Sequence, residues 1–208
     1  MGRMVETDVA IVGPGGGGAV LALMLAQQGI RSLVLEQAAG PPQGLRGEIL
    51  QPNGQRVLDR LGLLHRLPAN ATRSVRRFHF CRAGGERLCT VDYGDLPAPY
   101  NRAVVTLPNV AHHAILGALK EQNPEGLWYG TQFTGLRTDG TRVIGLRANR
   151  QGDEIEVSAR LVVGADQRPL DQPRVLMRLL VLMRDGGAAR GGGARVGLDD
   201  AKGRELAR

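Results

Sequence analysis

A glycine-rich segment near the N-terminus, Gly-Pro-Gly-Gly-Gly-Gly at 13–18, constrains the fold of this chain more than any other feature. It follows the apolar, β-branched run 7–12 and precedes the helix-forming run 19–28. A second apolar run, 32–35, comes next and ends at Glu36. Strand, glycine turn, helix and strand in this order form a βαβ unit, whose crossover makes the two strands parallel. The sequence therefore predicts an α/β fold that begins with a Rossmann-like unit.

The glycines also match the G-x-G-x-x-G pattern of dinucleotide-binding sites, in the context that this pattern requires. In such a turn Gly13 permits the tight bend, Gly15 lets the backbone approach a pyrophosphate, and Gly18 lets the helix pack closely on the strand. The N–H groups at the start of the helix then face the phosphates. An acidic residue at the end of the second strand can accept hydrogen bonds from the ribose hydroxyls. We therefore predict a nucleotide site made by Gly13, Gly15, Gly16, Gly17, Gly18 and Glu36, rather than a merely flexible turn.

The chain after this unit alternates between helical and β patterns. A helix is expected over 52–61, a hairpin with its turn at Gly84-Gly85 over 75–93, and a second helix over 112–122. Residues 127–163 then predict a β meander. Its expected strands lie near 127–129, 133–138, 143–148, 154–157 and 160–163.

The composition changes after Asp166. Residues 167–208 hold nine basic and five acidic residues, seven glycines, no aromatic residue and one apolar stretch, 175–183. A segment of this kind cannot bury a core of its own. We expect one domain over 1–166, with β strands around 75–107 that begin a second, β-rich region. Residues 167–208 are expected to form an irregular, disordered Arg/Gly-rich tail.

The charge, the cysteine content and the apolar stretches bear on the partners, the metal content and the location of the protein. The net charge is +7, but the basic residues are scattered, which favours a solvated basic surface over a nucleic-acid partner. Cys81 and Cys89 have no metal-ligating neighbours, so we expect a reduced pair and no metal site. No signal segment precedes residue 7, and the longest apolar stretch, 19–26, is shorter than the ~20 residues that a membrane span needs. We therefore expect a cytoplasmic protein without a membrane span.

Three segments resemble the para-hydroxybenzoate hydroxylase-type FAD monooxygenases. They are residues 8–37, the stretch Leu-Arg-Gly-Glu-Ile-Leu-Gln-Pro at 45–52, and Leu-Val-Val-Gly-Ala-Asp at 161–166. The stretch 45–52 is also similar to the squalene epoxidase branch of the same superfamily. The resemblance covers residues 7–166 and implies an FAD-binding domain with part of a β-rich substrate region.

The resemblance implies that FAD occupies the Rossmann site and that NAD(P)H donates electrons. A flavin hydroperoxide would then hydroxylate a small aromatic or isoprenoid substrate. Four further residues would contact the cofactor: Gln37 beside Glu36, Arg46 on the flavin side, Asn109 where the family often carries Gln or Arg, and Asp166. Because the cofactor carries the chemistry in such enzymes, we predict no catalytic acid, base or nucleophile. His112 and His113 are interpreted as surface or packing residues.

One departure from the family follows Asp166. The family continues with Gly and then with a Ser and an Arg, whereas this chain continues Gln-Arg-Pro-Leu-Asp-Gln-Pro over 167–173. A later Gly-Asp motif is also missing, which suggests a truncated or frameshifted copy. Two alternatives therefore stay open, a non-catalytic FAD- or nucleotide-binding remnant and an NAD(P)-dependent Rossmann oxidoreductase without flavin.

Overall fold

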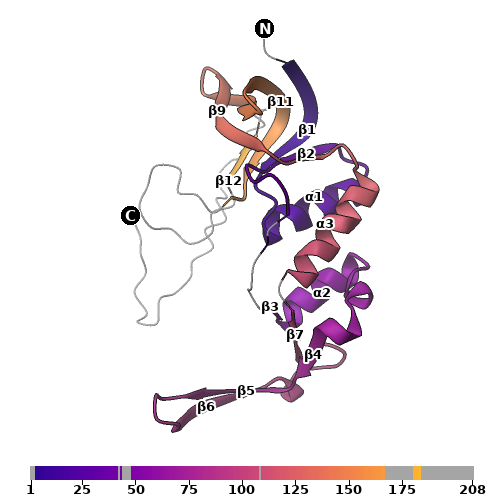
Figure 1. Ribbon diagram of the computed structural model, residues 1–208, viewed down its shortest axis with the longest axis vertical. Coiled ribbons are helices and arrows are strands. Elements are labelled where there is room, and N and C mark those ends of the chain that lie inside the picture. Colours follow the sequence, from indigo (N-terminus) through magenta and orange to yellow (C-terminus); the bar gives the residue numbers. More distant parts are fainter. Residues whose placement is uncertain (1–2, 42, 44–47, 108, 167–179, 184–208) are drawn as a thin grey trace, which may run out of the picture.

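A seven-stranded mixed sheet forms one end of the elongated molecule (Figure 1). The computed structural model describes residues 3–41, 43, 48–107, 109–166 and 180–183. The sheet has the order β8-β2-β1-β11-β10-β9, and β12 pairs with β11. Its strands are β1 (Arg3–Val12), β2 (Ser32–Leu35), β8 (Leu127–Trp128), β9 (Thr131–Asp139), β10 (Arg142–Arg150), β11 (Asp153–Gly164) and β12 (Leu180–Met183).

The centre of the sheet is parallel, because β1 pairs in parallel with both β2 and β11. Side chains alternate across β1, so that Val9 and Ile11 face one side and Ala10 and Val12 the other. On the first side Ile11 packs in one cluster with Ala22 of α1 (Gly16–Gln27) and Leu119 of α3 (Val110–Gln122). These two helices lie side by side and cover this face (Figure 1).

The opposite face of the parallel strands is covered by the antiparallel meander of β9, β10 and β11. Ala10 and Leu33 share a buried cluster with Leu146 of β10 and Val157 of β11. β11 belongs both to the parallel centre of the sheet and to the meander, since it pairs in parallel with β1 and antiparallel with β10. The C-terminal half of β1, Val9–Val12, is therefore buried on both faces, as its uninterrupted apolar sequence requires.

A second, smaller β region lies beyond the helices. It contains a three-stranded sheet, β3-β7-β4, and a two-stranded hairpin, β5-β6, which projects at the far end of the molecule (Figure 1). The elements are β3 (Glu48–Leu50), α2 (Pro52–Arg60), β4 (Thr72–Val75), β5 (Arg77–Cys81), β6 (Arg87–Asp92) and β7 (Ala103–Thr106), with short 3₁₀ turns at Leu64–Arg66, Ala69–Ala71 and Tyr93–Asp95. The buried Gln55 of α2 donates hydrogen bonds from Nε2 to the carbonyls of Leu50 and Arg102, and so joins α2 to this sheet.

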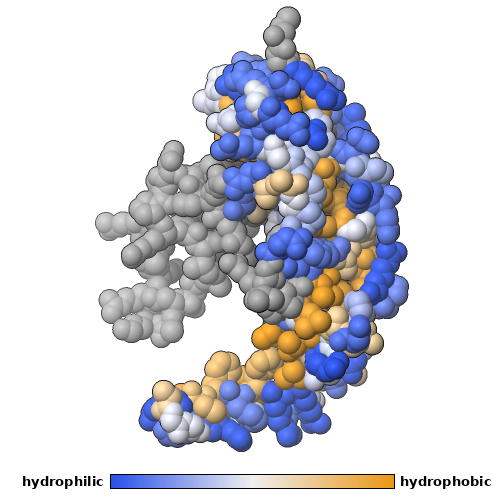
Figure 2. Space-filling view, in the orientation of Figure 1, coloured by the Kyte–Doolittle hydropathy of each residue, from blue (hydrophilic) through white to orange (hydrophobic). Residues whose placement is uncertain are grey.

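This smaller region exposes apolar side chains to solvent. Figure 2 shows apolar atoms in a strip that runs from the helices toward the hairpin. The large exposed residues here are Ile49, Val57, Phe80, Leu88, Val91, Leu96 and Leu107. A contiguous apolar surface of this kind is typical of a contact with a ligand or with further protein.

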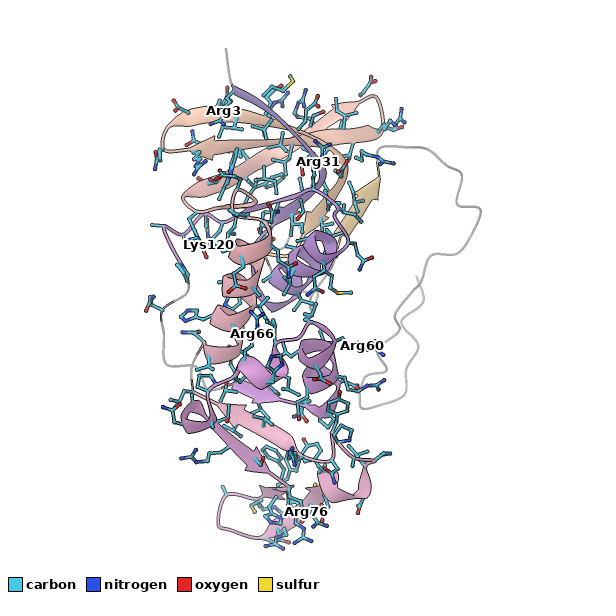
Figure 3. The ribbon with its side chains drawn as sticks, turned by 90° about the vertical axis from the view of Figure 1, so that its right-hand side faces the viewer. Arg3, Arg31, Arg60, Arg66, Arg76 and Lys120 are labelled. Atoms are coloured by element: carbon cyan, nitrogen blue, oxygen red, sulfur yellow. The ribbon has the colours of Figure 1, made fainter. Side chains whose placement is uncertain are left out.

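Basic side chains, in contrast, are spread along the molecule. Figure 3 labels six of them from one end of the long axis to the other: Arg3, Arg31 and Lys120, then Arg66 and Arg60 at about the same height, and Arg76. Several have carboxylate partners, among them Arg31 with Asp8 at 3.1 Å and Arg66 with Glu121 at 3.1 Å. The positive charge of the described residues is thus divided among separate, partly neutralised positions. Within the described ranges, no helix is both long and apolar enough to cross a membrane.

The structure confirms the βαβ unit, both later helices and the hairpin around Gly84-Gly85. It corrects three expectations about the sheet. β8 pairs in parallel with β2 at the far edge, so it is not part of the meander. The strands expected at 154–157 and 160–163 are one continuous strand, β11, because β1 pairs with it along its whole length. β1 also begins at Arg3 rather than at residue 7, for the same reason.

The tail beyond Asp166 is described only in part. Leu180–Met183 form β12, which pairs antiparallel with Leu161–Gly164 of β11. The other residues from 167 to 208 lie outside the described part of the chain. The domain boundary at 166 therefore stays a prediction.

Candidate functional site

The candidate site lies where three neighbouring parallel strands end together. Val12 at the end of β1 is in register with Leu35 of β2 on one side and with Gly164 of β11 on the other. β1 is followed by the glycine turn, β2 by Glu36, and β11 by Ala165 and Asp166. Ligands of open α/β sheets bind in the crevice beyond the carboxyl ends of the strands. The structure thus brings together three of the sequence-predicted segments at one edge.

The glycine turn is held closely against the end of β11. Gly13 is buried and has φ +95°, a conformation that favours glycine. A Cβ at this position would lie 2.7 Å from Cα of Asp166, which is too close for any side chain. The backbone N–H of Gly13 donates to the Leu35 carbonyl at 2.8 Å, and that of Ala165 donates to the Val12 carbonyl at 2.7 Å.

The next glycines differ in what surrounds them. A Cβ on Gly18 would lie 2.1 Å from the Gly13 carbonyl oxygen and 3.1 Å from Cβ of Ala165, so the first turn of α1 packs directly on the glycine turn. A Cβ on Gly15 would meet only the Ala165 carbonyl oxygen, at the ordinary distance of 3.5 Å. Gly16 and Gly17 are exposed and have open space where a Cβ would be. Gly13 and Gly18 are therefore required by the fold, whereas the fold does not require Gly15, Gly16 and Gly17.

Hydrogen bonds of both the backbone and the side chain fix the position of Glu36. Its N–H donates to the Trp128 carbonyl at 2.9 Å, and its carbonyl accepts from the Thr131 N–H at 2.8 Å. Its carboxylate Oε1 accepts from the N–H of Ala38 at 2.7 Å. The side chain is half-buried beside the glycine turn, so it presents an oriented acceptor at the end of β2.

Gln37 and Asp166 lie at the same edge of the sheet. Gln37 is exposed and directly follows Glu36. Asp166 is exposed as well, and its backbone lies over Gly13. Both positions are consistent with the predicted site, and their roles toward a cofactor stay predictions.

Asn109 lies at the start of α3 with φ 60°, in the left-handed conformation that an asparagine tolerates. Two contacts fix this end of the helix. Oε2 of Glu48 in β3 accepts from the N–H of Ala111 and from Oγ1 of Thr106, both at 3.2 Å. Nε2 of His112 is 2.6 Å from the carbonyl oxygen of Pro14 in the glycine turn. The helix start is therefore attached both to β3 and to the glycine turn.

Arg46 lies outside the described residues. Glu48, two residues later, is the first described residue after that gap, and its carboxylate joins the segment to α3.

Two residues of this region were not predicted from the sequence as parts of the site. Tyr129 is half-buried near Glu36, and burial together with the negative charge of Glu36 raises the pKa of its phenol above the ordinary value. His112 was interpreted as a packing residue, but it contacts the glycine turn. Neither belongs to a sequence motif, and only the fold brings them to the glycine turn or to Glu36.

The chemistry available at this edge is that of binding rather than of acid–base catalysis. It consists of backbone N–H groups at a helix start, an oriented carboxylate and several small residues. In the described part of the chain, no three or more His, Cys, Asp or Glu side chains gather in a way that could hold a metal ion.

Comparison with known families gives a direct match. A profile of the family described as "FAD binding domain" matches residues 6–168. The chain is 34% identical over 166 residues to 6-methylpretetramide 4-monooxygenase of Streptomyces rimosus, which covers 78% of this chain and 39% of that protein. It is also 47% identical over 57 residues to squalene epoxidase 5 of Arabidopsis thaliana, which covers 27% of this chain and 11% of that protein.

The fold has known counterparts as well. The structure of p-nitrophenol 4-monooxygenase PnpA from Pseudomonas putida DLL-E4 superimposes with a TM-score of 0.68 at 22% identity, and covers 79% of this chain and 41% of that one. This likeness shows the fold alone. The matched part of the chain thus spans about two fifths of the length of each of these two monooxygenases.

The packing around the glycine turn predicts different effects for two neighbouring glycines. Gly18→Ala would press a methyl group into the Gly13 carbonyl, so we expect a loss of about 1–3 kcal/mol of unfolding free energy, the usual cost of overpacking. Gly17→Ala is the matched control, since its methyl group would enter open space within the same helical turn. Thermal or urea denaturation of the apoprotein measures both. Equal stability of the two variants would contradict the described packing.

Proposed function

Because this chain belongs to the FAD binding domain family, we propose that it binds FAD at the carboxyl ends of β2, β1 and β11. We further propose that the whole protein is an FAD-dependent monooxygenase. The single observation that carries the proposal is the close approach of Asp166 to Gly13 beside the start of α1. It places glycines without side chains at the carboxyl ends of parallel strands, the position at which dinucleotides bind in such sheets.

The residues at this edge fit FAD. Gly15, Gly16 and Gly17 have no structural need to be glycine, so their missing side chains leave room for a close ligand. The start of α1 carries no side-chain cap, and its first-turn N–H groups suit a pyrophosphate. Half-buried Glu36 suits the hydroxyls of the adenosine ribose. We assign the pyrophosphate to Gly13–Gly18 and the ribose to Glu36, with Gln37 beside it.

Asp166, Asn109 and Arg46 are proposed to contact the part of FAD that extends past the glycine turn. Support differs among them. Asp166 lies directly over Gly13. Asn109 begins the helix whose first turn contacts Pro14. Arg46 is proposed on the resemblance of residues 45–52 alone, because it lies outside the described chain.

Bound FAD would supply the redox chemistry by which electrons from NAD(P)H and one oxygen atom of O2 reach the substrate. The substrate class is proposed from two relatives, one named for 6-methylpretetramide and one for squalene. It is a small, largely apolar aromatic or isoprenoid molecule. The exposed apolar side chains of the smaller β region, such as Ile49 and Leu107, support a substrate of this kind.

Cofactor choice tests the proposal most simply. We expect purified protein to bind FAD at least about tenfold more tightly than NAD, because the glycine turn and the family point to a flavin dinucleotide. The measurement is equilibrium titration of the apoprotein, followed by flavin fluorescence for FAD and by calorimetry for NAD. Uptake of NAD without uptake of FAD would instead support the flavin-free oxidoreductase.

Monooxygenation is tested with isotopically labelled oxygen. The whole protein to which the proposal applies, loaded with FAD, is incubated with NADH or NADPH, ¹⁸O₂ and a panel of phenols, polycyclic aromatics and isoprenoids. We expect one ¹⁸O atom in a product from at least one class. NAD(P)H oxidation that yields hydrogen peroxide and no labelled product across the panel would favour the non-catalytic FAD-binding alternative.

The role of Glu36 is tested by substitution. Glu36→Ala removes an ionised acceptor for the ribose, so we expect FAD affinity to fall by about 1–3 kcal/mol, the usual value of a hydrogen bond to a charged group. Glu154→Ala is a suitable control, because Glu154 is an exposed carboxylate near the opposite end of β11. Unchanged FAD affinity in the Glu36 variant would show that this carboxylate does not contact the ribose.

A further inference from the structure

One contact near the glycine turn joins residues that are 98 positions apart in the sequence. Nε2 of His112 lies 2.6 Å from the carbonyl oxygen of Pro14. A carbonyl oxygen can only accept, so Nε2 must carry the proton and donate it. Both residues are at least half-buried, so this hydrogen bond is partly shielded from water.

The geometry of the peptide bond extends the effect of this contact to Gly15. The Pro14 carbonyl and the Gly15 N–H belong to the same planar peptide unit. In a trans unit these two groups point in opposite directions, so a donor that fixes the carbonyl also fixes the direction of the N–H. His112 therefore determines which way the Gly15 N–H points.

The rest of the turn is fixed by other means. The N–H of Gly13 donates to Leu35, and the carbonyl of Gly15 accepts from Ala19 at 2.9 Å. Pro14 has no N–H to donate. The Pro14–Gly15 peptide lies between these two points, in a turn whose following residues, Gly16 and Gly17, have no side chains to restrain it.

His112 itself is well placed to act as a restraint. It lies in the first turn of α3, directly after the buried Ala111, whose N–H donates to Glu48. Ile115, one turn further on, is buried in the cluster shared with α1 and α2. The position of the imidazole is thus set by the packing of α3 rather than by the glycine turn.

We propose that His112 is a positioning residue, which orients the Gly15 N–H toward the pyrophosphate of FAD through the Pro14 carbonyl. The inference rests on the proposed FAD binding. His112 does not touch the cofactor. Its hydrogen bond restrains the turn before the ligand arrives. The turn then loses less conformational entropy on binding, which raises its affinity for ligands that carry a pyrophosphate.

The test compares two substitutions at His112 with a neighbouring control. His112→Leu removes the donor, whereas His112→Gln keeps a donor, Nε2, at a similar distance from the backbone. His113→Leu is the control, because it makes the same change at the next, exposed position of α3. Affinities for FAD and for ADP are measured by titration of the folded protein, and thermal midpoints are measured for each variant.

We expect His112→Leu to weaken both FAD and ADP about tenfold, equivalent to about 1.4 kcal/mol. His112→Gln should remain within about threefold of the parent, and His113→Leu should not differ from it. Adenosine, which has no phosphate, should bind all four proteins equally, as measured by ligand-observed NMR.

Other outcomes overturn the inference in distinct ways. Unchanged FAD affinity in His112→Leu would show that the contact does not orient the turn. Equal losses in the Leu and Gln variants, or an equal loss for adenosine, would show that the imidazole does not act through its hydrogen bond to Pro14. Failure of the parent protein to bind FAD or ADP would contradict the proposed function itself.

Discussion

The close approach of the end of β11 to Gly13 is the constraint on which the rest of the structure depends. β1 can place Gly13 under Asp166 only because it lies between two parallel partners that end in register with it. Gly18 then brings the start of α1 against the Gly13 carbonyl. The path of the chain from β1 through the turn into α1 therefore depends on two positions, Gly13 and Gly18, that admit no side chain.

This constraint also explains why the site is built from distant segments. β11 starts in the antiparallel meander and ends beside the glycine turn, so the meander and the binding edge share one strand. α3 packs on α1, and its first turn contacts both the glycine turn, through His112, and β3 of the smaller sheet, through Glu48. A ligand at the strand ends would consequently contact elements whose positions are coupled by the core rather than by loops alone.

Local sequence patterns predicted the βαβ unit, because the glycine spacing, the apolar runs and Glu36 all lie within residues 7–36. They also predicted the hairpin at Gly84-Gly85, because its two strands and its turn lie close together in the sequence. They did not predict β3, whose partner β7 lies more than 50 residues later, or the position of β8 at the far edge of the sheet. They also did not indicate the contact between His112 and the glycine turn, since its acceptor is visible only once α3 is packed on the turn.

The central claim is that FAD binds at the glycine edge of the parallel strands. The most direct measurement is the ¹H–¹⁵N NMR spectrum of labelled protein during addition of FAD. The account predicts that the largest changes fall on the amides of residues 13–18, 36–38 and 165–166, with small changes in the hairpin of β5 and β6. Changes concentrated in that hairpin or in α2, with the glycine amides unaffected, would contradict it.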